Sequence, residues 1–316
     1  AGLDKTVLTV PLPSVFRLLL IGSSSPPRTS GIRRQEGVFL LDIGEMVGRG
    51  RRAEVYALGN DKVLKLYQVG VDRTWPEREA DLTRRVNEAG VPSPRVFDVV
   101  HLSGRAGIVY ERIQGPRLED QIRANPGKVQ DYAFLHAELH AEIHKHVLED
   151  LPSQRDAQRR AIERGSLLSC QIKNAALESL QALPDGNALC HGDLNVQNVI
   201  LSPRGPVVID WDNACKGNPL ADVARVMLLM RMGKYHSQSR EEREAVERLT
   251  EEYRRAYAER YLELRPGTME ELQAWTFPLA AARVAENISE EQEALLAVVA
   301  AALPSKSASR SLPPQD

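Results

Sequence analysis

The amino-acid sequence predicts an α+β chain with two lobes, the first built on an antiparallel sheet with one helix and the second larger and mostly helical. Short apolar runs alternate with glycines over residues 38–113, a pattern typical of antiparallel strands. Over residues 114–303, apolar residues recur at steps of three and four, which is typical of helices. A length of 316 residues suits two lobes, because a domain typically has about 150 residues.

Five strands are expected in the N-terminal lobe, at residues 38–43, 54–58, 63–66, 95–102 and 107–113. One helix is expected after the third strand. Thr74 supplies an N-cap there, a proline follows in the first turn, and Glu77 stands three residues after the cap. These residues form a capping box, so they predict the start of the helix. Gly90 and Pro92 predict its end.

The C-terminal lobe begins with a helical stripe of apolar residues between Tyr132 and Val147. Three short apolar runs separated by polar turns interrupt the helical pattern at residues 188–190, 199–201 and 207–209. Such turns on short strands are typical of functional loops. The remaining helices are expected at residues 219–233, 240–263, 269–287 and 290–303.

Both ends of the chain differ in composition from the two lobes. Residues 1–37 contain four prolines and no acidic residue between Asp4 and Glu36. We interpret this segment as a disordered leader or the product of a misassigned start codon, and a targeting segment is the alternative. The tail at residues 304–316 is rich in serine and proline, so we expect it to be disordered as well.

Composition excludes several classes of partner. The 41 Lys and Arg residues nearly balance the 43 Asp and Glu residues, so no basic field is available for nucleic acid. The longest late apolar run, at residues 294–303, is too short for a membrane span of about 20 residues. The three cysteines lack metal or redox spacing, which favours a reducing compartment and a cytoplasmic protein. The oligomeric state is left open.

The first motif is glycine-rich. The segment from Gly48 to Val55 fits G-x-G-x-x-G-x-V, with Ala53 in place of the third glycine. Gly48 and Gly50 would let backbone N–H groups approach phosphate oxygens closely. The alternative is an ordinary hairpin turn. No G-x-x-x-x-G-K-[ST] occurs in the sequence, which argues against a P-loop.

A lysine and a glutamate follow the glycine-rich motif. Lys65 stands on a predicted strand, and Glu79 shares a helix face with Leu82 and Val86, which turns it toward the sheet. We expect Lys65 and Glu79 to form an ion pair that holds the ammonium near the phosphates of a nucleotide. Glu77 is the rival partner, and an ordinary surface salt bridge is the alternative interpretation.

The most specific motif is His-Gly-Asp-Leu-Asn-Val-Gln-Asn at residues 191–198. Asp193 and Asn198 are five residues apart, the spacing at which a kinase catalytic loop carries its proton-accepting Asp and its Mg²⁺-binding Asn. Asp210 ends an apolar run 17 residues after Asp193. It stands where a second metal-binding carboxylate is expected.

Residues 190–226 resemble the aminoglycoside phosphotransferase and choline kinase family, and the earlier motifs agree in order and spacing. The resemblance extends over roughly residues 38–303 and implies a two-lobed, protein-kinase-like fold. It implies that Asp193 is the catalytic residue and that Mg²⁺ is bound by Asn198 and Asp210. The implied ATP-binding residues are Gly48, Gly50, Lys65, Glu79 and a hinge of Tyr110, Glu111 and Ile113. Asp222 matches a family position that we interpret as structural.

Two departures from protein kinases indicate the type of acceptor. Gly192 stands where protein kinases carry an Arg that grips a phosphorylated activation loop, and no A-P-E follows Asp210. The segment Gly217–Asp222 begins seven residues after Asp210, which leaves no room for a peptide-docking segment. We therefore expect a phosphotransferase that uses ATP and Mg²⁺ and acts on a hydroxyl of a small molecule. A nucleotide-binding module without turnover and a protein kinase are the alternatives.

Three histidines invite a metal interpretation. His136, His140 and His144 are spaced by four residues and share one helix face. A zinc-protease motif requires Glu directly after the first His, and Ala137 stands there. We therefore interpret the histidines as a packed or solvated helix edge rather than as a metal site.

Overall fold

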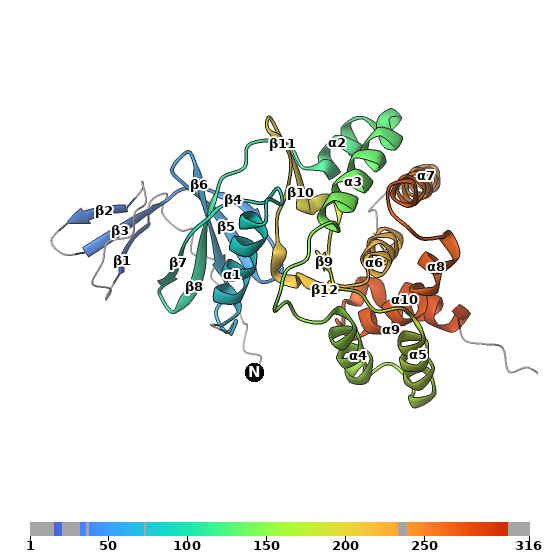
Figure 1. Cartoon of the computed structure of the whole chain (residues 1–316). Helices are drawn as coiled ribbons and strands as arrows, with labels where there is room; N and C mark the ends of the chain where they lie inside the picture. Colours follow the sequence, from blue (N-terminus) through green and yellow to red (C-terminus); the bar gives the residue numbers. More distant parts are fainter. Residues whose placement is uncertain (1–15, 21–31, 36–37, 73, 233–238, 303–316) are drawn as a thin grey trace, which may run out of the picture. The chain divides into compact units, whose positions relative to one another are not determined.

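The computed structural model describes the chain except for residues 1–15, 21–31, 36–37, 73, 233–238 and 303–316 (Figure 1). The chain divides into two compact units between Gln114 and Gly115. The first unit contains antiparallel sheets and one helix, and the second is mostly helical (Figure 1). The predicted α+β class is therefore confirmed.

The first unit contains a five-stranded antiparallel sheet with the order β4-β5-β6-β8-β7. Its strands are β4 (Met46–Arg49), β5 (Ala53–Leu58), β6 (Lys62–Tyr67), β7 (Val96–Leu102) and β8 (Arg105–Glu111). Apolar side chains cover both faces. One face buries a cluster that includes Leu64 and Val109, and the other buries Ile108 and Tyr110 with Ala80 of the helix α1 (Thr74–Glu88).

The helix α1 begins as predicted, but a different side chain caps it. Asp72 accepts hydrogen bonds from both the backbone N–H and the hydroxyl of Thr74, each at 2.9 Å. Asp72 therefore supplies the acceptor at the start of the helix, and Thr74 is the first residue of the helix rather than its N-cap. At the other end the chain reverses at Gly90, whose φ of 87° suits glycine.

The predicted first strand belongs to another sheet. Residues 38–43 form β3 (Val38–Ile43), which lies between β1 (Phe16–Leu20) and β2 (Ile32–Gln35) in a three-stranded antiparallel sheet. β1 and β2 lie within the segment that we expected to be a disordered leader, and β3 pairs with both strands along its backbone. The rest of residues 1–37 and residues 304–316 lie outside the described residues.

β4 takes the edge of the five-stranded sheet that we expected residues 38–43 to occupy. Gly48, which we expected in a loop, lies in β4 opposite Val55, next to an irregular register between Met46 and Gly48. A glycine in a strand is typical of such irregularities.

The second unit contains nine α-helices within the described residues. They are α2 (Leu118–Ala124), α3 (Val129–Ile143), α4 (Gln154–Arg164), α5 (Cys170–Ala182), α6 (Pro219–Met232), α7 (Arg240–Leu264), α8 (Met269–Ala274), α9 (Thr276–Val284) and α10 (Ser289–Ala302). The one helix expected at residues 269–287 is two helices, α8 and α9. Pro278 has no N–H to donate to the carbonyl of Ala274, so the first helix ends there.

Two short two-stranded antiparallel sheets interrupt the helices of the second unit. β9 (Ala188–Cys190) pairs with β12 (Cys215–Gly217), and β10 (Val199–Ser202) pairs with β11 (Gly205–Val208). These strands hold both ends of the loop at residues 191–198. Within the described residues, no helix combines the length and the apolar character that crossing a membrane requires.

Candidate active site

The loop at residues 191–198 carries Asp193 in a tight turn. Gly192 has a φ of 78°, and a Cβ placed on it would lie 2.5 Å from the carbonyl oxygen of Asn213. Both the backbone conformation and the contact therefore require glycine. The turn is closed by the amide of Asn198, whose Nδ2 donates to the carbonyl of Asp193 at 2.9 Å.

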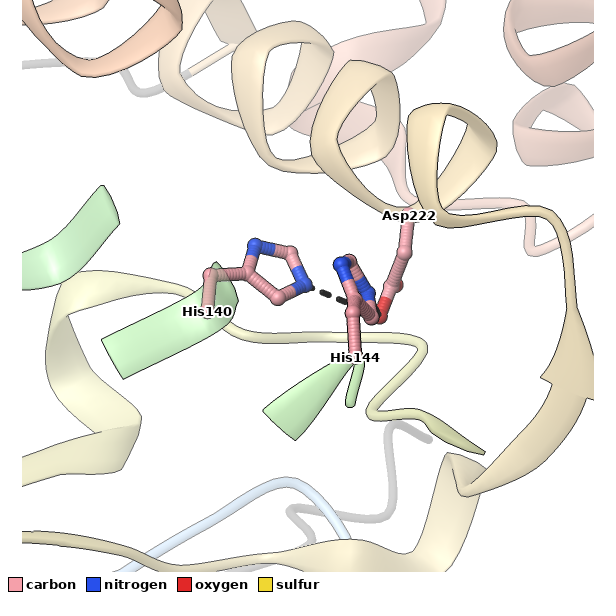
Figure 2. Close-up of side chains that lie close together, drawn as sticks. All are labelled: His140, His144 and Asp222. Carbon is pink, nitrogen blue, oxygen red and sulfur yellow. Dashed lines mark hydrogen bonds and ion pairs between the residues drawn. The ribbon is translucent and has the colours of Figure 1, made fainter. Parts of the chain in front are cut away.

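Asp222 holds the start of this loop through hydrogen bonds to its backbone. Its carboxylate is fully buried in the first turn of α6 and accepts the backbone N–H groups of His191 at 2.7 Å and Gly192 at 3.0 Å. His140 and His144 also contact its Oδ2, at 3.1 and 3.4 Å (Figure 2). Burial alone would raise the pKa of Asp222, but the hydrogen bonds from the two histidines hold it well below its ordinary value. A structural role for Asp222 fits this geometry.

His140, His144 and Asp222 are residue types that bind metals, and their ligand atoms lie within 4.8 Å of one another. However, both nitrogens of each ring have a hydrogen-bond partner inside the protein, Asp222 on one side and a tyrosine hydroxyl on the other. The cluster is therefore satisfied by hydrogen bonds alone. This agrees with the interpretation of the histidine row as a packed helix face.

Asp193 is partly buried, and its environment suits a proton acceptor. Burial, with a smaller contribution from the charge of Asp210, raises the pKa of its carboxyl to about 6, although Arg225 and Arg283 act in the opposite direction. Among the described residues, no group donates a hydrogen bond to its carboxylate. A carboxylate with a raised pKa and available oxygens can take a proton near neutral pH.

Asn198 and Asp210 are brought together by the backbone. The N–H of Ile209 donates to the carbonyl of Asn198 at 2.9 Å, which places Asp210 one residue beyond this contact. Asp210 adopts a left-handed conformation, with φ 68° and ψ 60°. Such strain at a non-glycine residue is common at functional sites. The two side chains offer an amide oxygen and a carboxylate, and oxygen donors of this kind fit Mg²⁺.

The first unit contains the predicted ion pair. The ammonium of Lys65 lies 2.7 Å from Oε1 of Glu79, whose side chain is only 2% exposed. The hydroxyl groups of Tyr67 and Tyr110 also donate to the Glu79 carboxylate, Tyr110 at 2.8 Å. Glu77, the rival partner, is exposed. The pairing is therefore observed, and its role in holding phosphates stays a prediction.

The other predicted nucleotide-binding residues of the first unit lie on β4, on the turn after it and at the end of β8. Gly50 closes the turn after β4, because its N–H donates to the carbonyl of Ala53 at 2.8 Å. Tyr110 turns its side chain toward Glu79, so a hinge role would fall to its backbone. The Glu111 carboxylate accepts the N–H of Arg95 at 3.2 Å, and Ile113 is half-buried. Their contacts with a nucleotide stay predictions.

Arg52, in the turn after β4, is exposed. Its guanidinium lies over the ring of Trp75, 4.5 Å from its centre. Trp75 is the second residue of α1, so this contact joins the turn to the helix that carries Glu79.

Sequence reasoning did not single out three tyrosines that belong to the surroundings of this loop. Tyr253, Tyr257 and Tyr261 of α7 pair with the three histidines of α3. The available signal was their spacing, since tyrosines and histidines both recur every four residues.

Solved structures place the fold in the kinase-like class. An aminoglycoside-3'-phosphotransferase of type VIII matches with a TM-score of 0.55 and 21% identity, over 81% of this chain and 95% of that chain. Another match is an aminoglycoside phosphotransferase from Streptomyces rimosus, with a TM-score of 0.52 and 18% identity over 75% of this chain and 92% of that one. A choline kinase from Cryptosporidium parvum has a TM-score of 0.51 and 13% identity, over 82% and 87% of the two chains.

The model of the phosphotransferase enzyme family matches residues 45–275, well over half of the chain. The chain therefore belongs to the phosphotransferase enzyme family, and the resemblance seen in the sequence is confirmed. A search of curated proteins found no match to the sequence.

Proposed function

We propose that the protein transfers the γ-phosphoryl group of ATP to a hydroxyl group of a small molecule, with Mg²⁺ as cofactor. The observation that carries the proposal is the loop at residues 191–198. In this loop the pKa of Asp193 is raised, and the side-chain amide of Asn198 donates to the carbonyl of Asp193. The carbonyl of Asn198 in turn accepts the N–H of Ile209, the residue before Asp210. Membership of a phosphotransferase family supports the same reaction class.

The side chains of this chain divide the chemistry between them. Asp193 orients the acceptor hydroxyl and takes its proton as the oxygen attacks the γ-phosphorus, and the bond to the β-phosphate oxygen breaks. Lys65, steered by Glu79, pairs with the phosphates of the leaving group. Asn198 and Asp210 would hold Mg²⁺, which neutralises the charge on the phosphates when bound. Catalysis then rests on positioning and charge, without a covalent intermediate on the protein.

The proposal of a small acceptor is supported by the chain that follows Asp210. A single 3₁₀ turn at Trp211–Asn213 leads directly into β12 and then into α6. This leaves no long segment on which a peptide substrate could lie, which disfavours the protein-kinase alternative. The module without turnover is disfavoured because Lys65, Asp193, Asn198 and Asp210 are all present.

The test measures ADP release from Mg-ATP with a panel of candidate acceptors. The panel contains aminoglycosides and choline, because similar solved structures bear those names, together with macrolides, hydroxy-amino acids and sugars. Asp193→Ala should lower turnover by at least about a hundredfold, the lower range for loss of a general base. Binding of ATP should stay close to that of the wild type. Asp131→Ala, on an exposed position of α3, is the matched control.

Each outcome has a definite meaning. Acceptor-dependent ADP release that Asp193→Ala abolishes supports the proposal and names the acceptor class. Wild-type turnover in Asp193→Ala contradicts the catalytic assignment. If Mg-ATP raises the melting temperature but no acceptor stimulates release, the regulatory module becomes the better interpretation. Transfer of labelled phosphate to protein would favour the protein kinase.

A further inference from the structure

Two parallel helices of the second unit are joined by three side-chain pairs, which we call the Tyr–His ladder. Its rungs are Tyr253–His136, Tyr257–His140 and Tyr261–His144, with distances from hydroxyl oxygen to Nδ1 of 3.0, 2.5 and 2.6 Å. The partners of every rung are 117 residues apart, so α3 and α7 run in the same direction. All six side chains are at most 4% exposed. Buried polar pairs of this kind require every group to have a partner.

In the first rung, the contact of the other ring nitrogen of His136 decides which partner donates the hydrogen bond. Nε2 of His136 lies 3.1 Å from the carbonyl oxygen of Leu194, which can only accept a hydrogen bond. Nε2 therefore carries the proton. Burial lowers the pKa of His136 to about 3, so the ring is neutral and Nδ1 must be an acceptor. The hydroxyl of Tyr253 therefore donates to it, in preference to the carbonyl of Tyr132 at 3.5 Å.

The third rung has the same direction. Nε2 of His144 lies 3.4 Å from Oδ2 of Asp222, a carboxylate that stays ionised and accepts only. Burial lowers the pKa of His144 to about 4, so Nδ1 accepts from Tyr261. His140 likewise joins Tyr257 to Asp222. Figure 2 shows the second and third histidines converging on the carboxylate.

The far ends of the ladder flank Asp193 on both sides. Asp222 binds the N–H groups of the two residues before Asp193, at 2.7 and 3.0 Å. His136 binds the carbonyl of Leu194, the residue directly after Asp193. The backbone is thus held immediately before and after the side chain that we propose as the proton acceptor. A helix pair that needed only to pack could use apolar side chains in these places.

We propose that Tyr253, Tyr257 and Tyr261 are positioning residues that act on the Asp193 loop through the histidines of α3. Each phenol donates to Nδ1 and fixes the orientation of a ring whose Nε2–H bonds to Leu194 or Asp222. This inference rests on the proposed function for its effect on turnover, and it reaches the loop through contacts that exist without substrate.

Removal of one hydroxyl has a defined consequence. In Tyr253→Phe, the Nδ1 atom of His136 stays buried without a donor, which is unfavourable for a polar group. The proton stays on Nε2, because the Nδ1–H form would leave both ring nitrogens without a partner. The ring loses the contact that fixes its orientation, so its bond to the carbonyl after Asp193 weakens and the carboxylate spends less time in the reactive position.

The first experiment compares Tyr253→Phe with Tyr132→Phe, which removes a phenol of α3 that lies outside the ladder. Nitrogen-15 NMR of the histidine side chains should show the Nε2–H form of His136 in wild type and in Tyr132→Phe. In Tyr253→Phe the proton should stay on Nε2, and the Nδ1 resonance of His136 should shift because this atom no longer accepts a hydrogen bond. We expect kcat to fall about tenfold in Tyr253→Phe, the effect of one hydrogen bond, with an unchanged KM for ATP.

The second experiment does not depend on activity. Amide hydrogen exchange of His191 and Gly192 reports their bonds to Asp222. In Tyr261→Phe this exchange should quicken about tenfold, the effect of weakening one hydrogen bond. Exchange at Ile209, which donates to Asn198, should keep its wild-type rate.

Substitution of a histidine gives a rescue test that keeps all tyrosines. In His136→Gln the amide can still accept from Tyr253 and donate to Leu194, whereas His136→Met can do neither. His136→Gln should keep most of kcat, and His136→Met should resemble Tyr253→Phe. These two variants also test the positioning role of Tyr253 if Tyr253→Phe fails to fold.

An Nδ1 resonance of His136 that is unchanged in Tyr253→Phe, together with unchanged exchange at His191 and Gly192 in Tyr261→Phe, would overturn the proposal. Equal kcat in His136→Gln and His136→Met would overturn it as well. If the wild-type protein phosphorylates no acceptor, the proposed function fails, but the NMR and exchange results still test the ladder. The two failures are therefore distinguishable.

Discussion

Each unit contains a buried carboxylate that gathers several donors, and the two carboxylates use different kinds of donor. Glu79 in the first unit binds the ammonium of Lys65 and the hydroxyl groups of Tyr67 and Tyr110. Asp222 in the second unit binds two backbone N–H groups and two imidazole rings. Both side chains are at most 2% exposed.

The difference indicates what each carboxylate holds in place. Lys65 is a flexible side chain with 18% of its surface exposed, so its ammonium can exchange one anionic partner for another. The donors to Asp222 are backbone amides and rings fixed by packing, which have no such freedom. The Glu79 cluster therefore suits the reception of a charged ligand, and the Asp222 cluster suits the fixing of a loop.

The largest expected effect comes from removing the Asp222 carboxylate. Asp222→Ala leaves two backbone N–H groups and two ring nitrogens buried without their acceptor. We expect the free energy of unfolding to fall by about 3–5 kcal/mol, the usual cost of breaking a buried charged network. Urea unfolding followed by circular dichroism measures this change. A loss below about 1 kcal/mol, the value for an exposed ion pair, would contradict the conclusion that Asp222 fixes the loop more firmly than Glu79 holds its partners.

The pH dependence of stability should follow the histidines of the second unit. Burial lowers the pKa values of His136 and His144 to about 3 and about 4. Below pH 6.5 these two histidines therefore bind protons in the unfolded chain but stay neutral in the folded chain. Stability is then complete above pH 6.5 and falls as the pH drops toward 4. Asp193 opposes this below pH 6, because its raised pKa lets the folded state bind a proton first.

His136 and His144 against Asp193 contribute a net loss of about 1.4 kcal/mol per pH unit between pH 6 and pH 4.5. His191, whose pKa burial also lowers, adds to this loss. Urea titrations at a series of pH values measure the slope. The variant Asp193→Asn lacks the opposing group, so its slope should be steeper than that of the wild type. Stability that rises from pH 6.5 down to 4.5 would contradict the assignment of neutral, buried histidines.

A smaller effect on stability is expected in the first unit. Glu79→Gln keeps an acceptor for Tyr67 and Tyr110 but removes the charge opposite Lys65. Because Lys65 is partly exposed, we expect a loss of about 1–2 kcal/mol, less than for Asp222→Ala. The affinity for Mg-ATP, measured by calorimetry, should fall because the ammonium is no longer steered. Unchanged affinity would show that Glu79 stabilises the unit without shaping the nucleotide site.

Local patterns predicted much of the fold and the site. The glycine at position 192, the spacing of Asp193 and Asn198, and the short strands on either side could all be read along the chain, because each depends on neighbours in sequence. The pairing of Lys65 with Glu79 followed from the face of a helix. By contrast, Val38–Ile43 was assigned to the wrong sheet, since an apolar run does not name its partner strand.

The sequence by itself determined the family, the order of the lobes and the residue types at the candidate site. Only the tertiary structure decided that the histidines of α3 face the tyrosines of α7, 117 residues away, and that Asp222 receives two of them. The spacing of four residues gives each helix a polar row, but it does not say which rows meet. That choice depends on which helices pack together, and packing is a property of the folded chain as a whole.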